Sequence, residues 1–241
     1  MIIKKDLCIG CRRCLPYCPV GAISFTKSIS VVDQDRCYEC GTCLRSQVCP
    51  VDAIKESPFV YDFPRSVRKA FSDPIVTHVQ TGVAGRGTEE SKTNDVTGRI
   101  KKGEVGIGIE VGRPTVGIRI VDIEVITRAL AKTGVVEYEP QNPTTYFIKS
   151  FKTGEIKEEY KKEKILSGIL EIKTDRKNLP ILLRAIKRVI PEFKDIFSLN
   201  IITRLDPDTQ IPVLNILQKE GFPPRPHAKI NLGLGKPLKE D

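Results

Sequence analysis

Near the start of the chain stands Cys8-Ile-Gly-Cys11-Arg-Arg-Cys14-Leu-Pro-Tyr-Cys18-Pro19, and its pattern returns as Cys37-Tyr-Glu-Cys40-Gly-Thr-Cys43-Leu-Arg-Ser-Gln-Val-Cys49-Pro50. These two segments hold all 8 cysteines of the 241 residues. In each, three cysteines at Cys-x-x-Cys-x-x-Cys spacing are followed by Cys-Pro. Four thiolates in this arrangement are typical ligands of a four-iron cluster. The sequence therefore predicts two such clusters.

The similarity between the two segments goes beyond cysteine. Cys18-Pro-Val-Gly-Ala-Ile matches Cys49-Pro-Val-Asp-Ala-Ile almost residue for residue, which indicates an internal repeat and duplication of one half-domain. With these motifs, residues 1–58 resemble a bacterial-type two-cluster ferredoxin. The resemblance implies a small electron-transfer module, in which Ile2, Ile3, Val31 and Val32 would supply short paired strands.

In the bacterial form of this motif, the cysteine before proline ligates the other cluster. The predicted ligands are Cys8, Cys11, Cys14 and Cys49 for cluster 1, and Cys37, Cys40, Cys43 and Cys18 for cluster 2. The second run departs from the family pattern, because five residues separate Cys43 from Cys49 where three separate Cys14 from Cys18. Lengthening a loop costs little, so we expect Cys49 to remain a ligand. A three-iron or labile first cluster is the alternative.

Two other uses of the cysteines are disfavoured. A disulfide framework belongs to oxidising compartments, and the chain begins Met-Ile-Ile-Lys-Lys without an apolar signal segment, which favours a cytoplasmic protein. Structural zinc normally takes two Cys-x-x-Cys pairs and does not need triplets followed by Cys-Pro. We therefore expect neither disulfides nor zinc.

Four arginines lie inside or beside the cysteine loops: Arg12, Arg13, Arg36 and Arg45. Cations close to a cluster stabilise its more negative reduced state and raise its reduction potential. If these side chains instead extend into water, screening removes most of that effect. The sequence leaves both alternatives open.

Composition narrows the class of protein and of partner. No run of 18 apolar residues occurs, which argues against a membrane span. The net charge is +9, yet only 6% of residues are aromatic and there is no Trp, so nucleic-acid binding is disfavoured. A basic chain is also suited to an acidic protein partner.

A segment rich in Gly and Thr follows residue 80. Its glycines Gly82, Gly85 and Gly87 would let backbone amides approach an anion, and Arg86 and Thr88 would add donors. The phosphate of a flavin or a nucleotide is a chemically suitable ligand. The segment matches no established phosphate-binding motif, so an ordinary surface loop or linker is the alternative.

Strand and helix patterns return from residue 103. The pattern predicts strands at 105–111, 135–139, 144–151, 165–173 and 196–204, a hairpin turn at Thr153-Gly154, and helices at 122–133 and 179–190, with Asp122 as N-cap of the first helix. Repeated strand-helix-strand units indicate an α+β sandwich of ferredoxin-like style, with helices on one face of a mainly antiparallel sheet.

The predicted organisation is therefore a cluster domain at 1–58, a linker or loop segment at 59–102, and an α+β accessory domain at 103–241, or two small units divided near 155–165. Nothing after residue 58 resembles a family that we identify. The favoured function is an iron-sulfur electron-transfer protein or subunit that serves a partner oxidoreductase. A homo-oligomer is compatible with this function. The alternatives are a reductase whose C-terminal region binds flavin or an organic substrate, and an iron-sulfur redox sensor.

Overall fold

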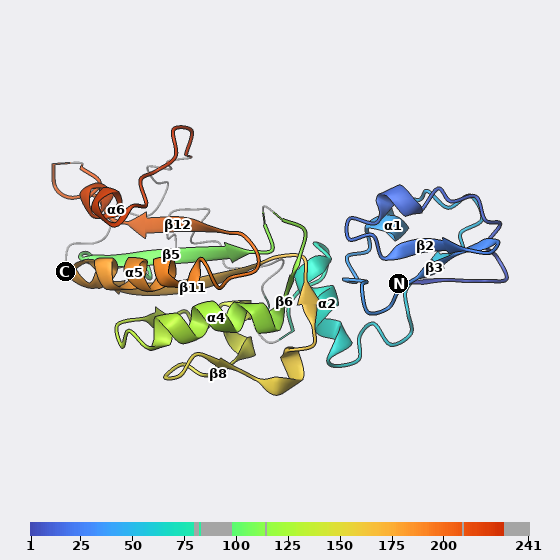
Figure 1. The fold of residues 1–241 in the computed structure, drawn as a ribbon, viewed down its shortest axis with the longest axis horizontal. Coiled ribbons are helices and arrows are strands. Elements are labelled where there is room, and N and C mark those ends of the chain that lie inside the picture. Colours follow the sequence, from blue (N-terminus) through green and yellow to red (C-terminus); the bar gives the residue numbers. More distant parts are fainter. Residues whose placement is uncertain (80–81, 83–97, 114, 209, 229–241) are drawn as a thin grey trace.

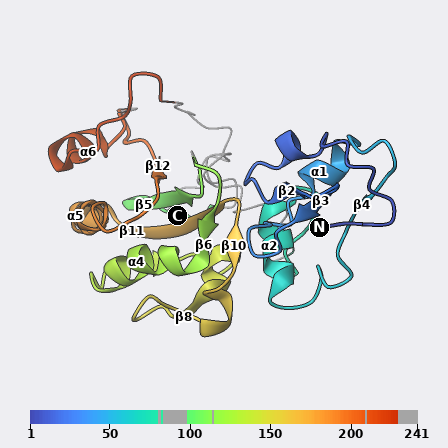
Figure 2. The same cartoon turned by 45° about the vertical axis from the view of Figure 1, so that its right-hand side comes forward.

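The computed structural model describes residues 1–79, 82, 98–113, 115–208 and 210–228. A small module that carries all the cysteines lies at one end of the molecule, and a larger domain built on a sheet lies at the other (Figure 1). Helix α2 (Arg65–Ser72) lies between them, also when the molecule is turned (Figure 2). Helices and strands are mixed, which confirms the predicted α+β class.

The N-terminal module is made of two short antiparallel pairs of strands. Strand β1 (Ile2–Ile3) pairs with β4 (Ile54–Lys55), and β2 (Ile23–Thr26) forms a hairpin with β3 (Ile29–Val32). The helical turn η1 (Leu15–Tyr17) follows the first cysteine triplet, and α1 (Thr42–Arg45) contains Cys43, the last cysteine of the second triplet. Its core is small: Met1, Ala22, Ile23 and Ile54 pack beside three of the cysteines.

The larger domain contains a four-stranded sheet in the order β12 (Phe197–Thr203), β5 (Glu104–Val111), β11 (Gly168–Asp175) and β7 (Glu137–Tyr138), with every neighbouring pair antiparallel. Alternate residues of β5 are apolar, and Val105, Ile107, Ile109 and Val111 are fully buried. This alternation gives the sheet one apolar face, which the helices cover.

Helices α4 (Ile120–Ala131) and α5 (Leu179–Val189) pack on that face and against each other. Their buried residues follow the helical period: Ile123, Ile126 and Leu130 in α4, and Leu179, Leu182, Leu183 and Ile186 in α5. The predicted cap of the first helix is wrong, because the N-cap is Arg119 and Asp122 lies in the first turn, where its carboxylate accepts hydrogen bonds from Arg119. Both helices otherwise match their predicted ranges closely.

Between β7 and β11 the chain is less regular than predicted. Residues 143–147 form a 3-10 helix, η2 (Pro143–Phe147), because Asn142 Oδ1 accepts a hydrogen bond from Thr144 N, so the strand β8 (Ile148–Ser150) begins late. The predicted hairpin turn at Gly154 is confirmed, and β8 pairs with β9 (Glu155–Ile156). The predicted strand at 165–173 is divided into β10 (Lys164–Ile165), which pairs with β6 (Ile118–Arg119), and β11.

The remaining described elements are η3 (Glu158–Tyr160), η4 (Arg176–Asn178) and α6 (Leu214–Glu220). Helix α6 ends at Gly221, whose φ of 82° suits glycine. Helix α2 contributes Val67, Ala70 and Phe71 to the apolar core of the larger domain. Among the residues that the structure describes, no helix combines the length and the apolar character needed to cross a membrane. The predicted repetition of a strand-helix-strand unit after residue 103 remains a prediction.

Candidate metal centres

The two Cys-x-x-Cys-x-x-Cys loops share one backbone conformation. In the first loop Gly10 and Arg12 have φ angles of 71° and 61°, and in the second the equivalent residues Glu39 and Gly41 have φ angles of 58° and 70°. Side chains disfavour this left-handed region. Each loop nevertheless places two residues in this region. The backbone adopts it because the chain must wind around the thiols.

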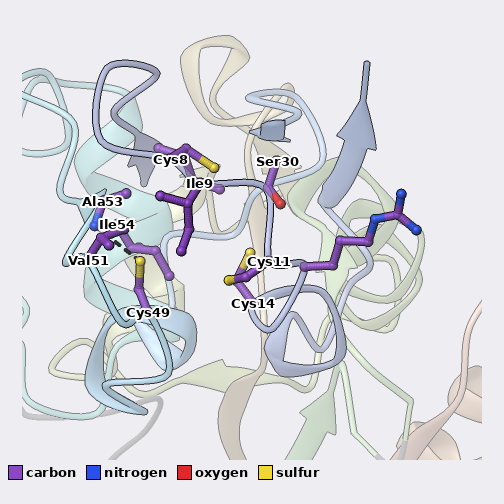
Figure 3. Close-up of a pocket in the computed structure, with 11 residues that line it drawn as sticks. Cys8, Ile9, Cys11, Cys14, Ser30, Cys49, Val51, Ala53 and Ile54 are labelled. Atoms are coloured by element: carbon purple, nitrogen blue, oxygen red, sulfur yellow. Dashed lines mark hydrogen bonds between the residues drawn. The ribbon is translucent and has the colours of Figure 1, made fainter. Parts of the chain in front are cut away.

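The first set of thiols surrounds a cavity. Figure 3 shows the side chains of Cys8, Cys11, Cys14 and Cys49 around it, the last of these from a segment 35 residues after Cys14. The rest of the lining is largely apolar and includes Ile3, Ile9, Arg12, Ser30, Val51, Ala53 and Ile54. The structure thus brings together the four residues predicted for cluster 1.

The second set of thiols is also brought together. Cys18, Cys37 and Cys40 all lie near enough to Cys43 to interact electrostatically with its thiol. Burial, together with the negative charges of these neighbours, raises the pKa of Cys43 to about 12. The Cys43 thiol therefore binds a metal centre only with release of its proton.

The two cysteines that precede proline accept equivalent hydrogen bonds. Ala22 N donates to Cys18 Sγ over 3.1 Å, and Ala53 N donates to Cys49 Sγ over 3.2 Å. In both segments the residue before the alanine, Gly21 or Asp52, has a positive φ, of 60° and 50°. Amide groups aimed at sulfur stabilise thiolate charge, and they are one of the means by which proteins set cluster potentials. Both sets of residues therefore fit a four-iron cluster.

A single-metal site is a poorer match. Within the described parts of the chain, no three Cys, His, Asp or Glu side chains gather to hold one metal ion. Structural zinc requires its sulfur ligands within about 2.3 Å of one ion. Four irons at the corners of a cluster let the thiolates stand further apart.

The comparisons with known proteins decide the family. The 4Fe-4S dicluster domain family matches residues 7–53. Ferredoxin-2 of Chlorobaculum tepidum is 44% identical over 55 residues, which are 20% of this chain and 86% of that ferredoxin. The chain belongs to the two-cluster 4Fe-4S ferredoxin family. It carries two 4Fe-4S clusters, and the family points to iron-sulfur electron transfer.

Two further relatives are subunits of larger enzymes. Pyruvate synthase subunit PorD of Methanothermobacter marburgensis is 43% identical over 53 residues, 22% of this chain and 59% of that subunit. A component of the ion-translocating oxidoreductase complex of Methanosarcina acetivorans is 44% identical over 48 residues, 20% of this chain and 17% of that component. The chain thus spans less than two thirds of either relative. Each of these similarities extends over 48 to 55 residues, about the length of the ferredoxin module.

The longer spacing before Cys49 is accommodated locally in the ferredoxin module. Helix α1 forms one turn over the start of the extra segment, with a hydrogen bond of 3.0 Å from Ser46 N to Thr42 O. Gln47 then takes a left-handed φ of 50°, and the chain returns to the first cavity at Cys49. The insertion is therefore absorbed before the cysteine is reached.

A charged network on the outside of the second cysteine loop was not anticipated from the sequence. Glu39 is fully buried and pairs with the amino group of Met1 and with the guanidinium of Arg65. Although burial opposes ionisation, these hydrogen bonds keep the pKa of Glu39 below its usual value. Arg68 pairs with Glu163 over 2.5 Å, with both side chains buried. The only sequence signal was the run of basic residues at 65–69, which looks like an ordinary solvated helix face.

The arginines noted in the loops have different environments. Arg45 donates to Asp73 Oδ1 over 2.5 Å and to Cys40 O over 2.7 Å. Arg36 donates to Val20 O over 3.2 Å. Arg12 lies 3.9 Å above the centre of the Phe25 ring, and Arg13 is exposed. Of these four arginines, only Arg45 donates a hydrogen bond to a residue of a cysteine loop.

The predicted anion site falls mostly outside the described residues. Gly82 is described and has a φ of 67°, with no atom within 4 Å of where a Cβ would stand. Gly85, Arg86, Gly87 and Thr88 lie outside the residues that the structure describes. Flavin or nucleotide binding by this segment has no support from the relatives and remains a prediction.

Proposed function

We propose that this protein relays single electrons through its two 4Fe-4S clusters to a partner oxidoreductase. Cys8, Cys11, Cys14 and Cys49 hold cluster 1, and Cys37, Cys40, Cys43 and Cys18 hold cluster 2. The observation that carries the proposal is the meeting of Cys49 with the first triplet around one cavity, and of Cys18 with the second. Each cluster supplies reversible one-electron transfer.

The protein's own groups prepare the two sites for that role. The largely apolar lining around the first set of thiols favours the less charged state of a cluster and lowers its potential. The amide groups of Ala22 and Ala53 act in the opposite direction, because a hydrogen bond to sulfur stabilises negative charge. Cysteines that ligate iron must stay reduced, which suits a reducing compartment such as the cytoplasm.

The relatives support a protein partner. Their names describe subunits of a pyruvate synthase and of an ion-translocating oxidoreductase complex. By analogy, residues 103–241 would position the ferredoxin module against a catalytic subunit. We also propose the division into residues 1–58, 59–102 and 103–241. Limited proteolysis of the holoprotein tests it, since the first cuts should fall within 59–102.

Iron content and paramagnetic resonance after anaerobic purification test the ligand assignment. The wild type should hold about eight irons per chain, and the Cys49→Ala and Cys37→Ala variants about four each. Reduced Cys49→Ala should keep the signal that Cys37→Ala loses. If both substitutions removed the same signal, the crossed assignment would be wrong, and a wild type without any reducible cluster would refute the electron-transfer function.

A further inference from the structure

The two sets of thiols differ in their exposure. In the first set Cys11 is exposed, Cys8 and Cys49 are half-buried, and only Cys14 is buried. In the second set the whole triplet of Cys37, Cys40 and Cys43 is buried. The first centre is therefore the more accessible of the two to a molecule that approaches from solution.

The difference arises because the rest of the chain covers the second loop. Arg68 donates to Cys37 O and to Asp35 O, each over 2.8 Å. Lys164, from β10, donates to the same Asp35 carbonyl over 2.9 Å. The Tyr38 ring packs on the backbone of Gly117, where a Cβ would lie 2.6 Å from Tyr38 Cζ. Helix α2 and the C-terminal domain thus occupy the side from which a partner would otherwise reach this loop.

The first loop is open and carries uncompensated positive charge. Its surface and the neighbouring hairpin tip present five exposed cations, Lys4, Lys5, Arg12, Arg13 and Lys27, against one exposed carboxylate, Asp6. The ion pairs found in the described regions include none of these five. A charge of about −2 on an oxidised cluster still leaves this face positive.

Apolar side chains accompany the charge. Leu7 is 43% exposed and Ile9 is 64% exposed, and both flank Cys8. The hairpin tip packs closely against the loop, because a Cβ on Gly10 would lie only 2.3 Å from Ser28 O. The loop surface is thereby held in one shape. An apolar centre with a charged surround is the usual composition of a protein interface.

We propose that the face formed by residues 4–13 and 27 is the docking site for an external redox protein with an acidic surface, and that electrons pass between that protein and cluster 1. The inference rests on the proposed electron-transfer function and adds to it the site and the charge of the partner. Complementary charge speeds the encounter of two proteins by roughly 10-fold to 1,000-fold at low ionic strength. Cluster 2 then exchanges electrons through cluster 1 or across the covered side.

The test uses the reduced holoprotein and oxidised flavodoxin, a small acidic flavoprotein, as the electron acceptor in anaerobic stopped-flow measurements. Charge reversal by Arg12→Glu with Arg13→Glu should slow the second-order rate at least about tenfold at low ionic strength. It should also flatten the dependence of the rate on salt. Because Arg12 contacts Phe25, a second pair, Lys4→Glu with Lys5→Glu, tests the same face without that contact.

The matched control is Lys132→Glu with Arg188→Glu, which reverses two exposed cations on the C-terminal domain. It should leave the rate within about twofold of the wild type. Iron content first establishes that the variants keep both clusters. Equal slowing by the control pair, or no slowing by either pair on the face, would then overturn the docking site. A wild type that forms a dimer, together with an Arg12→Glu and Arg13→Glu variant that is a monomer, would overturn it in favour of a second copy of the chain. A wild type without clusters would instead refute the proposed function itself.

Discussion

Arg68 donates a hydrogen bond of 2.8 Å from Nη1 to the carbonyl oxygen of Cys37, and so joins helix α2 to the backbone of the second cysteine loop. The same guanidinium pairs through Nε with Glu163, 95 residues further along the chain. Both charged side chains are buried. One residue therefore connects the ferredoxin module to the C-terminal domain.

Replacing Arg68 with Met should destabilise the protein strongly. The substitution leaves the buried carboxylate of Glu163 without its cation, and removing one partner of such a pair typically costs about 3–5 kcal/mol in the free energy of unfolding. Anaerobic denaturant titration, followed by circular dichroism, measures the loss. Adding Glu163→Gln should recover part of it, since the unpaired charge is then gone.

The control for that prediction is Arg184→Met, which breaks the exposed pair with Glu220. Solvent screens that pair, so its loss should change the stability far less. Comparable effects of the two substitutions would contradict the role of burial.

Gly117→Ala should loosen the contact between the module and the domain. Gly117 has a φ of 90°, and a Cβ there would lie 2.6 Å from the Tyr38 ring, so the methyl group adds a clash to backbone strain. We expect a loss of about 2 kcal/mol or more in the free energy of unfolding and faster proteolysis between the two parts.

Gly134→Ala supplies the comparison, because Gly134 has a φ of 68° but no atom within 4 Å of the added methyl. Backbone strain alone predicts a loss of about 1 kcal/mol. If both variants lost the same stability, contact with Tyr38 would not constrain position 117.

Stability should fall in mild acid because of His78. Burial lowers the pKa of this imidazole, whose ring packs between Phe71 and Tyr146 at centroid distances of 5.4 and 5.5 Å. The unfolded chain then binds a proton more readily than the folded one. The contribution of the neutral ring is complete above the unfolded pKa of about 6.5 and is lost as the pH falls below it.

Denaturant titrations at pH 7.5 and pH 5.5 should therefore show a stability difference of up to about 1 kcal/mol in the wild type. His78→Phe keeps an aromatic ring in the cluster with Phe71 and Tyr146 and should reduce that difference. The other of the 2 histidines, His227, is exposed, so His227→Gln should leave it unchanged. A pH dependence unaltered by His78→Phe would rule out this histidine as its source.

Removing iron with a chelator under anaerobic conditions should unfold the ferredoxin module and leave the C-terminal domain folded. The module's own apolar core consists of little more than Met1, Ala22, Ile23 and Ile54 beside the cysteines. Small domains of this kind depend on their metal for stability. Nuclear magnetic resonance of the apoprotein should show collapsed amide dispersion for residues 1–58 and retained dispersion for α4 and α5. Retained dispersion throughout would mean that the clusters are not structural.

The elements predicted well from the sequence are those whose signals are local. The spacing of Leu182, Leu183 and Ile186 repeats with the helical period, so the helix could be placed from a dozen residues alone. The strand of alternating residues at 105–111 was equally recognisable. The 3-10 turn at 143–147 was missed because it depends on a hydrogen bond that the Asn142 side chain accepts from Thr144 N, and strand propensity at Tyr146 and Phe147 suggested otherwise.

The sequence by itself determined the cofactor of this protein, because four-iron clusters are held by cysteine thiolates and the loops that deliver three of them are short. It also indicated which cysteine should complete each set. Only the tertiary structure decided that the second cysteine loop is covered and the first is open. That asymmetry comes from contacts such as Arg68 with Glu163 and Tyr38 with Gly117, which join distant residues. No local pattern encodes such pairs, since each residue alone looks like a surface charge, a loop aromatic or a turn.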